Sequence, residues 1–266
     1  MAATFLLGAA IGMTAKLASG QEMAFPEGVP PQIMEYDPEP GGVSVGVMGS
    51  GGGGAGVGTP GGNAPPPYVG PVAATASGGQ IAGELETAHL QTLSRKPYGA
   101  AAIESAQTLG VDPNSTAAIA NAESKFQNVP NRAGTTSARG IMQIVDGTWD
   151  DTVRKNNLPY TAADRGSPEA QMVVGNHIIR EYAATTQNAL GRPVTTGETY
   201  LSYLMGPTVG SRIAAASGDT PLSAIVPSRS LTNNGMSSWT VGQLRSYSRN
   251  ALGPAYDRLV LSRPGV

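Results

Sequence analysis

Residues 117–149 read AAIANAESKFQNVPNRAGTTSARGIMQIVDGTW, and this segment is the most informative about the fold class. In its first part, apolar residues such as Ile119 and Phe126 recur at helical spacing, which gives one face of a helix an apolar surface. Asp112 and Pro113 precede this run, and they suit an N-cap and the first position of a helix. The pattern predicts a helix that begins after Asp112 and reaches Phe126.

Glu123 lies beside the apolar face of this predicted helix, in its last turn. The unpaired carbonyls at a helix C-terminus disfavour a carboxylate, and partial burial acts in the same direction. Both effects raise the pKa of a glutamate from about 4.3 toward the ~6–7 that suits a general acid near neutral pH. Position alone favours an exposed glutamate at a helix end, so the candidate acid depends on the sequence that follows it.

The sequence after residue 80 carries further helix signals. Each consists of a capping residue followed by a helix-forming run, and sustained period-two alternation does not compete with them. The signals are Ser167-Pro168-Glu169 with a stop at Gly191, Thr195-x-x-Glu198 before a stop at Gly206-Pro207, and Thr240-x-x-Gln243 before Gly253-Pro254. The sequence predicts a mainly α-helical domain of about 140 residues.

The chain divides into four predicted parts. Residues 1–20 are an apolar segment, either a secretory signal peptide or a retained helix that docks on a partner or a membrane. Residues 1–15 are too short to span a bilayer as a helix, so any membrane contact there is expected at the surface. Residues 21–80 are a Gly/Pro-rich linker, expected to be disordered because it buries too little apolar surface. Residues 81–217 form the main helical domain, and residues 218–266 form a helical C-terminal extension.

Composition excludes several kinds of chemistry. The chain has no cysteine, which removes disulfide scaffolds, thiolate metal sites and thiol nucleophiles. Its two histidines, His89 and His177, form no metal-binding motif. A net charge of −2 gives no general argument for nucleic acid binding. We therefore expect no metal, no cofactor and no nucleic acid partner.

Three short blocks carry a family resemblance. ESKF at 123–126 is followed by GIMQ at 140–143 and then by SYLMGP at 202–207. In order and spacing they resemble the soluble lytic transglycosylases, the goose-lysozyme-like SLT family, whose blocks read roughly E-S-x-F, G-[LI]-M-Q and A-Y-N-A-G-P. The resemblance covers about residues 100–215. The later segments, including the Asn233-Asn234 pair and WTVG at 239–242, look most like phage-associated and alphaproteobacterial members.

The resemblance implies a lysozyme-like helical fold and cleavage of the β-1,4 bond between N-acetylmuramic acid and N-acetylglucosamine in peptidoglycan. It assigns the single catalytic glutamate to Glu123, as acid and then base in forming a 1,6-anhydro ring. Substrate-assisted glycosidases are a known exception to the two-carboxylate rule. The same matching gives the substrate-binding residues, with Ser124 closing the helix end, Met142 and Gln143 lining the sugar groove and Tyr203 orienting the Glu123 carboxylate.

The sequence departs from the family pattern at three positions. Leu204 stands where the family has Asn and Met205 where it has a small Ala, so one polar contact in the groove is expected to be lost. Gly134 stands where many members have Ser, and Ser137 is a candidate to supply that hydroxyl. These departures leave the preference for particular glycan subsites open.

Two alternatives remain beside the lytic transglycosylase. A muramidase of the same fold would admit water and release a reducing end, and a structural protein of a virion or secretion apparatus would retain only a wall-binding domain. The predicted partners are peptidoglycan strands and, through the N-terminal segment, such an assembly. The expected site of action is the periplasm or cell envelope, reached by export or by carriage in a phage virion.

Overall fold

The computed structural model describes residues 15–16, 22–23, 86–130 and 136–261. Most of the predicted N-terminal segment and linker therefore lies outside the described residues. Within them, Ala15–Lys16 (β1) and Glu22–Met23 (β2) pair as a short antiparallel ladder. The rest of the described regular structure is helical apart from isolated bridges, which confirms the predicted mainly α-helical class.

The helices follow one another along the chain, with the GIMQ block in the connection between α3 and α4. The first half contains α1 (Ala88–Ser94), α2 (Gly99–Thr108), α3 (Pro113–Ser124), α4 (Asp146–Lys155), the 3₁₀ helix η1 (Ala162–Gly166) and α5 (Pro168–Leu190). The second half contains α6 (Thr196–Met205), α7 (Pro207–Ala215), η2 (Leu222–Ala224), α8 (Ser228–Asn233), α9 (Val241–Leu252) and η3 (Gly253–Ala255). None of the described helices is long and apolar enough to cross a membrane.

The capping signals that the sequence contains are used in the structure. The Asp112 side chain accepts a hydrogen bond from the backbone N–H of Asn114 and caps α3. Thr195 and Thr240 each form a complete capping box with the residue three positions later. Helix α3 ends at Ser124 rather than at the predicted Phe126, because Lys125 and Phe126 adopt left-handed backbone angles, with φ of 55° and 59°.

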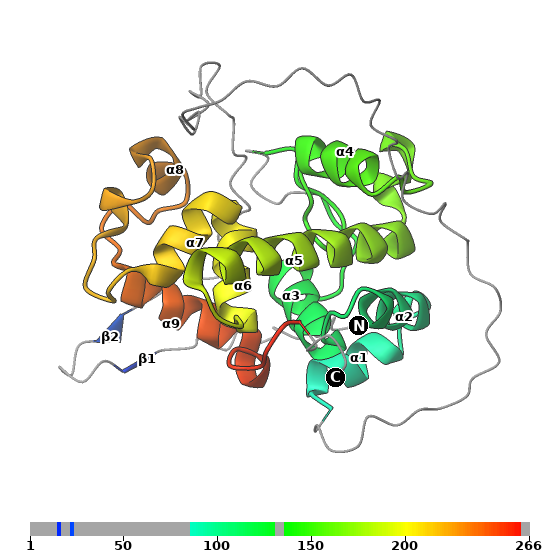
Figure 1. Cartoon of the computed structure of the whole chain (residues 1–266), viewed down its shortest axis with the longest axis horizontal. Helices are drawn as coiled ribbons and strands as arrows, with labels where there is room; N and C mark the ends of the chain where they lie inside the picture. The colour runs from blue at the N-terminus through cyan, green and yellow to red at the C-terminus, as the bar shows by residue number, and fades with distance from the viewer. Residues whose placement is uncertain (1–14, 17–21, 24–85, 131–135, 262–266) are drawn as a thin grey trace, which may run out of the picture.

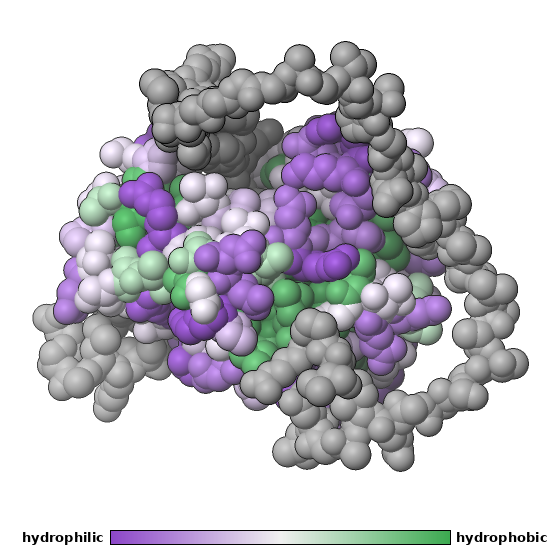
Figure 2. Space-filling model, viewed as in Figure 1, coloured by the Kyte–Doolittle hydropathy of each residue, from purple (hydrophilic) through white to green (hydrophobic). Residues whose placement is uncertain are grey.

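Helix α5 runs across the middle of the molecule and packs against α2, α4, α6 and α7 (Figure 1). Helix α3 packs against α1, α2 and α9, and α9 also packs against α6. The C-terminal helix α9 therefore lies against the two helices that carry Glu123 and Tyr203. Polar side chains cover most of the visible face, with apolar surface between them near its middle (Figure 2).

Candidate active site

Glu123 lies in the last turn of α3 with its side chain turned into the protein. The residue is 7% exposed, and its Oε1 atom is buried with no hydrogen-bond partner in the described part of the chain. The neighbouring residues on the helix, Ala122 and Ser124, are also buried. A buried carboxyl oxygen without a partner is costly for a stable fold and is a common mark of a functional group.

The surroundings of Glu123 favour its protonated form. Burial raises the pKa of Glu123 to about 8, against the opposing effects of the Tyr200 hydroxyl and the Lys125 charge. Tyr200 Oη is itself buried with no hydrogen-bond partner in the described residues, so it lies close to the carboxyl without the geometry of a hydrogen bond. At neutral pH the carboxyl therefore holds a proton that it can donate.

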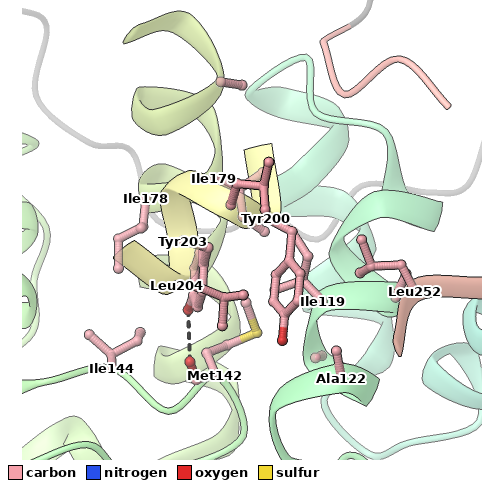
Figure 3. Close-up of a cluster of buried hydrophobic side chains, with 14 of the residues drawn as sticks. Ile119, Ala122, Met142, Ile144, Ile178, Ile179, Tyr200, Tyr203, Leu204 and Leu252 are labelled. Carbon is pink, nitrogen blue, oxygen red and sulfur yellow. Dashed lines mark hydrogen bonds between the residues drawn. The ribbon is translucent and has the colours of Figure 1, made fainter. Parts of the chain in front are cut away.

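Three tyrosines surround the Glu123 carboxyl. Tyr200 and Tyr203 come from α6, with their rings stacked at 6.5 Å between centroids, and Tyr247 comes from α9. Burial and the Glu123 charge raise the pKa of all three hydroxyls, so they stay neutral. In Figure 3 the Tyr200 hydroxyl points toward α3 near Ala122.

The expected role of Tyr203 requires a correction. Its hydroxyl donates a hydrogen bond of 2.7 Å to the backbone carbonyl of Met142, drawn as a dashed line in Figure 3. It therefore ties α6 to the GIMQ block and does not orient the Glu123 carboxylate by a hydrogen bond. Tyr200, one helical turn earlier, is the tyrosine that acts on the carboxyl. The spacing of the GIMQ and SYLMGP blocks does not indicate which of the two tyrosines acts on the Glu123 carboxyl.

Met142 also differs from the expected groove-lining position. The side chain is fully buried and packs against α5, where a Cβ atom on Gly175 would lie only 2.8 Å from the Met142 Cγ and Cε atoms. Leu204 and Met205 are buried too. These two departures from the family pattern thus belong to the core, and their apolar character fits that environment. The third departure, Gly134, lies outside the described residues.

Ser124 and Gln143 hold the end of α3 against the GIMQ block. The Ser124 hydroxyl donates to the Ile141 carbonyl at 2.8 Å and accepts from the Gln127 N–H at 3.2 Å, and these two bonds close the helix end. Gln143 has a left-handed backbone, with φ of 47°. Its amide nitrogen donates to two backbone carbonyls, of Gly140 at 2.7 Å and Val129 at 3.1 Å.

Ser137 lies at the edge of a hollow beside this loop. Its hydroxyl accepts a hydrogen bond from the Asp146 N–H at 3.0 Å, at the start of α4. The buried Arg165 forms an ion pair with Asp146 and donates to the carbonyls of Ser137 and Ile144. The hollow measures about 370 Å³ and is lined by residues 128–130, 136–140 and 165–166, so Ser137 faces it while Glu123 does not line it.

The described residues contain no cluster of three or more His, Cys, Asp or Glu side chains that would hold a metal ion. His89 contacts Asn121, with 3.2 Å between the ring Nε2 and the amide nitrogen. His177 is partly buried, and burial with the Arg180 charge lowers its pKa to about 4. Neither histidine contributes to the pKa of Glu123.

Sequence reasoning did not find Tyr200 and Tyr247. Tyr200 stands three residues before Tyr203 in a helix-forming run, and Tyr247 lies in the C-terminal extension, for which the sequence predicts no role. Both reach Glu123 only through helix packing. The sequence offers one signal for Tyr200, which is its place three residues before the motif tyrosine and so on the same face of the helix.

Comparison with known proteins agrees with the resemblance read from the sequence. Residues 100–220 match the family model described as the Transglycosylase SLT domain. This part of the chain, just under half of its length, is therefore similar to the transglycosylase SLT domain. The match includes Glu123, the GIMQ block and Tyr203.

The solved structures that resemble the chain include two lytic transglycosylases. One is an inactive mutant of lytic transglycosylase Slt from Pseudomonas aeruginosa, with 18% identity, a TM-score of 0.40 and a match over 62% of this chain and 26% of that one. The other is the 70 kDa soluble lytic transglycosylase from Escherichia coli, with 21% identity, a TM-score of 0.39 and a match over 61% and 26%. The chain thus matches about a quarter of the length of each.

Proposed function

We propose that the protein is a peptidoglycan lytic transglycosylase in which Glu123 is the acid and then the base. The observation that carries the proposal is the buried Glu123 carboxyl, whose Oε1 has no partner in the described residues and whose pKa is raised to about 8. The transglycosylase SLT domain at residues 100–220 supports the substrate, the glycan strand of peptidoglycan.

The proposed reaction needs a single carboxyl group. Protonated Glu123 donates its proton to the oxygen that bridges N-acetylmuramic acid and N-acetylglucosamine, and the bond from C1 to that oxygen breaks. The resulting carboxylate takes the proton of the C6 hydroxyl, whose oxygen bonds to C1 and closes the 1,6-anhydro ring. Glu123 is protonated again at the end, and no water is consumed.

The tyrosines supply the environment for these two steps. Neutral Tyr200 lies beside the carboxyl and stabilises its ionised form, which exists after the first proton transfer. The buried Tyr203 and the half-buried Tyr247 add rings that exclude water from the same region. We propose that this exclusion favours attack by the C6 hydroxyl over attack by water.

The test is digestion of purified peptidoglycan by the full chain, with the products analysed by mass spectrometry. The Glu123→Gln variant should lose at least about 10²–10⁴-fold in rate. The exposed Glu104 on α2 provides the control, since Glu104→Gln removes a carboxylate elsewhere and should retain full activity. Anhydromuropeptides that depend on Glu123 support the proposal, and reducing ends identify a muramidase instead.

The pH dependence gives a second test of the same proposal. The first step needs a protonated Glu123, so its rate should fall as pH rises through the raised pKa of about 8. An ordinary exposed glutamate would already be ionised near pH 4.5. Activity that disappears between pH 4 and 6 would contradict a buried acid at this position.

We also propose that the protein acts in the cell envelope, with residues 81–217 as the catalytic domain and residues 218–266 as its extension. Residues 1–20 would serve either as an export signal or as an attachment to a virion or secretion assembly. The mass of the mature N-terminus separates these two routes, because cleavage near Gly20 indicates export and an intact segment indicates attachment.

A further inference from the structure

The last described segment of the chain, Tyr256–Leu261, joins the starts of two helices; we call it the C-terminal strap. Its Val260 carbonyl accepts from the Asp112 N–H at 2.7 Å, at the start of α3. Its Arg258 carbonyl accepts from the Thr196 N–H at 2.8 Å, at the start of α6. The strap is thus hydrogen-bonded to the first residues of both helices.

Side chains strengthen the same junction. Arg258 Nε donates to Asp112 Oδ2 at 2.7 Å, in an ion pair whose side chains are 19% and 14% exposed. The hydroxyls of Ser115 on α3 and Thr196 on α6 lie 2.7 Å apart, and both residues are fully buried. Thr196 Oγ1 also lies 3.2 Å from the Arg258 carbonyl. Buried polar contacts of this kind require one relative position of the two helices.

The strap also packs tightly against α6. A Cβ atom on Gly197 would lie 2.4 Å from Cε2 of Tyr256, so the tyrosine ring rests directly on the helix backbone. The Gly197 N–H donates to the Tyr256 carbonyl at 2.9 Å. No larger residue fits at position 197 while Tyr256 remains in place, so the strap and α6 meet at one fixed distance.

The two helices that the strap joins carry the facing groups of the candidate active site. Glu123 lies near the far end of α3, and Tyr200 lies one turn into α6. We propose that Arg258 is a positioning residue, which through the C-terminal strap fixes α3 against α6 and so holds the Glu123 carboxyl beside Tyr200. The catalytic part of this inference rests on the proposed function.

Four charged or titratable groups face Glu123 in the part of the chain that the structure describes. They are Lys125 at the end of α3, Tyr200 and Tyr203 from α6, and Tyr247 from α9. Arg258 is not among them, because it contacts the opposite end of α3. A change at Arg258 therefore alters Glu123 only by moving the helices, which admits water and lowers the pKa of the carboxyl.

Four variants of the full chain test the proposal. Arg258→Ala removes the ion pair, and Arg258→Lys restores a positive charge. Asp112→Asn keeps a side-chain oxygen for the α3 cap but removes the charge that Arg258 contacts. Leu222→Ala is the matched control, because Leu222 is fully buried yet lies outside α3, α6 and the strap, so it weakens the fold without touching the junction.

The decisive measurement is the pKa of Glu123, from ¹³C NMR of the carboxyl carbons with Glu123→Gln to assign the signal. We expect Arg258→Ala and Asp112→Asn to lower this pKa, Arg258→Lys to recover most of it, and Leu222→Ala to leave it unchanged. On peptidoglycan, Arg258→Ala should lower kcat by about tenfold or more with KM little changed, since small misplacements at a reacting group are costly.

The proposal fails if Arg258→Ala lowers the melting temperature as Leu222→Ala does but leaves the pKa of Glu123 where it is. It fails equally if Arg258→Lys gives the same pKa of Glu123, the same kcat and the same melting temperature as Arg258→Ala. A restored positive charge beside Asp112 would then not restore the position of the helices. The titration does not require turnover. Absence of any Glu123-dependent product would overturn the proposed function, and the NMR result would still decide the role of the strap.

Discussion

Two regions that the sequence motifs mark as one site differ in how their polar atoms are satisfied. Around Glu123, the carboxyl Oε1 and the Tyr200 hydroxyl are buried without a hydrogen-bond partner among the described residues. In the loop 137–146, the Ser137 hydroxyl and the Gln143 amide nitrogen are engaged with backbone groups. The first region leaves the reacting carboxyl oxygen without a partner. The second engages most of its polar groups in holding its own shape, although Arg165 Nε beside it is also buried without a partner among the described residues.

The difference separates groups that react from groups that support. Satisfied polar groups rigidify a loop, whereas a buried carboxyl without a partner raises the free energy of the folded state in its charged form. Such a cost is characteristic of groups with a chemical task. Substitutions in the two regions should therefore have different effects on stability and on the pKa of Glu123.

The largest effect on stability is expected from Glu123→Gln at alkaline pH. The folded-state pKa is raised from 4.5 to about 8, so the stability that the protonated carboxyl contributes is complete below pH 4.5 and is lost as pH rises toward 8. Gln imitates the protonated form at every pH. The variant should therefore match the wild type near pH 4.5 and exceed it by up to about 5 kcal/mol above pH 8, measured by urea unfolding.

A variant that is less stable than the wild type at pH 8 would place Glu123 in a supporting role like that of the loop. The exposed Glu104→Gln change is the control for this measurement. It should show no growing difference between pH 4.5 and pH 8.

Arg165→Ala should destabilise the loop region strongly. Arg165 is 3% exposed, pairs with Asp146 and donates to the carbonyls of Ser137 and Ile144. Its removal takes a charged donor from both carbonyls, so we expect a loss of about 3 kcal/mol in the free energy of unfolding. Arg154→Ala, which breaks an exposed pair with Asp151, should cost at most about 1 kcal/mol. Equal losses for the two variants would refute a supporting network.

The two stacked tyrosines should respond in opposite ways to loss of their hydroxyls. Tyr203→Phe leaves the buried Met142 carbonyl without its donor and should cost about 1–3 kcal/mol. Tyr200→Phe loses no hydrogen bond and should change stability little, but it should raise the pKa of Glu123 further, because the Tyr200 hydroxyl lowers it. Unfolding curves and NMR titration of the pair give both values, and a reversed pattern would restore the expected role of Tyr203.

Local signals predicted much of the fold, and tertiary packing decided the rest. The caps at Asp112, Thr195 and Thr240 were readable because a cap depends on residues two or three positions apart. The position of Glu123 in the last turn of α3 followed from the same local pattern. The position of Tyr200 beside the Glu123 carboxyl did not follow from a local pattern, because that position depends on how α6 is placed beside α3 in the folded chain.

The motif residues were harder to orient than to find. Met142 belongs to a short block whose spacing does not indicate which side chain faces solvent, and the structure buries it against α5. Tyr203 was recognised, but its partner is a backbone carbonyl rather than a side chain. Every residue has a backbone carbonyl, so motif spacing does not indicate which acceptor a tyrosine hydroxyl will contact.

The contact between Met142 and Gly175 has a use in recognising related chains. Because a single added carbon at position 175 would strike the methionine side chain, the two residues are expected to change together across a family. A search pattern that joins the GIMQ block to a glycine in the middle of the following long helix would reject chance matches to the four-letter block alone. The same pattern would identify related chains in which the glycine is replaced and the methionine is kept. In these chains we expect the GIMQ block to pack less closely against the long helix.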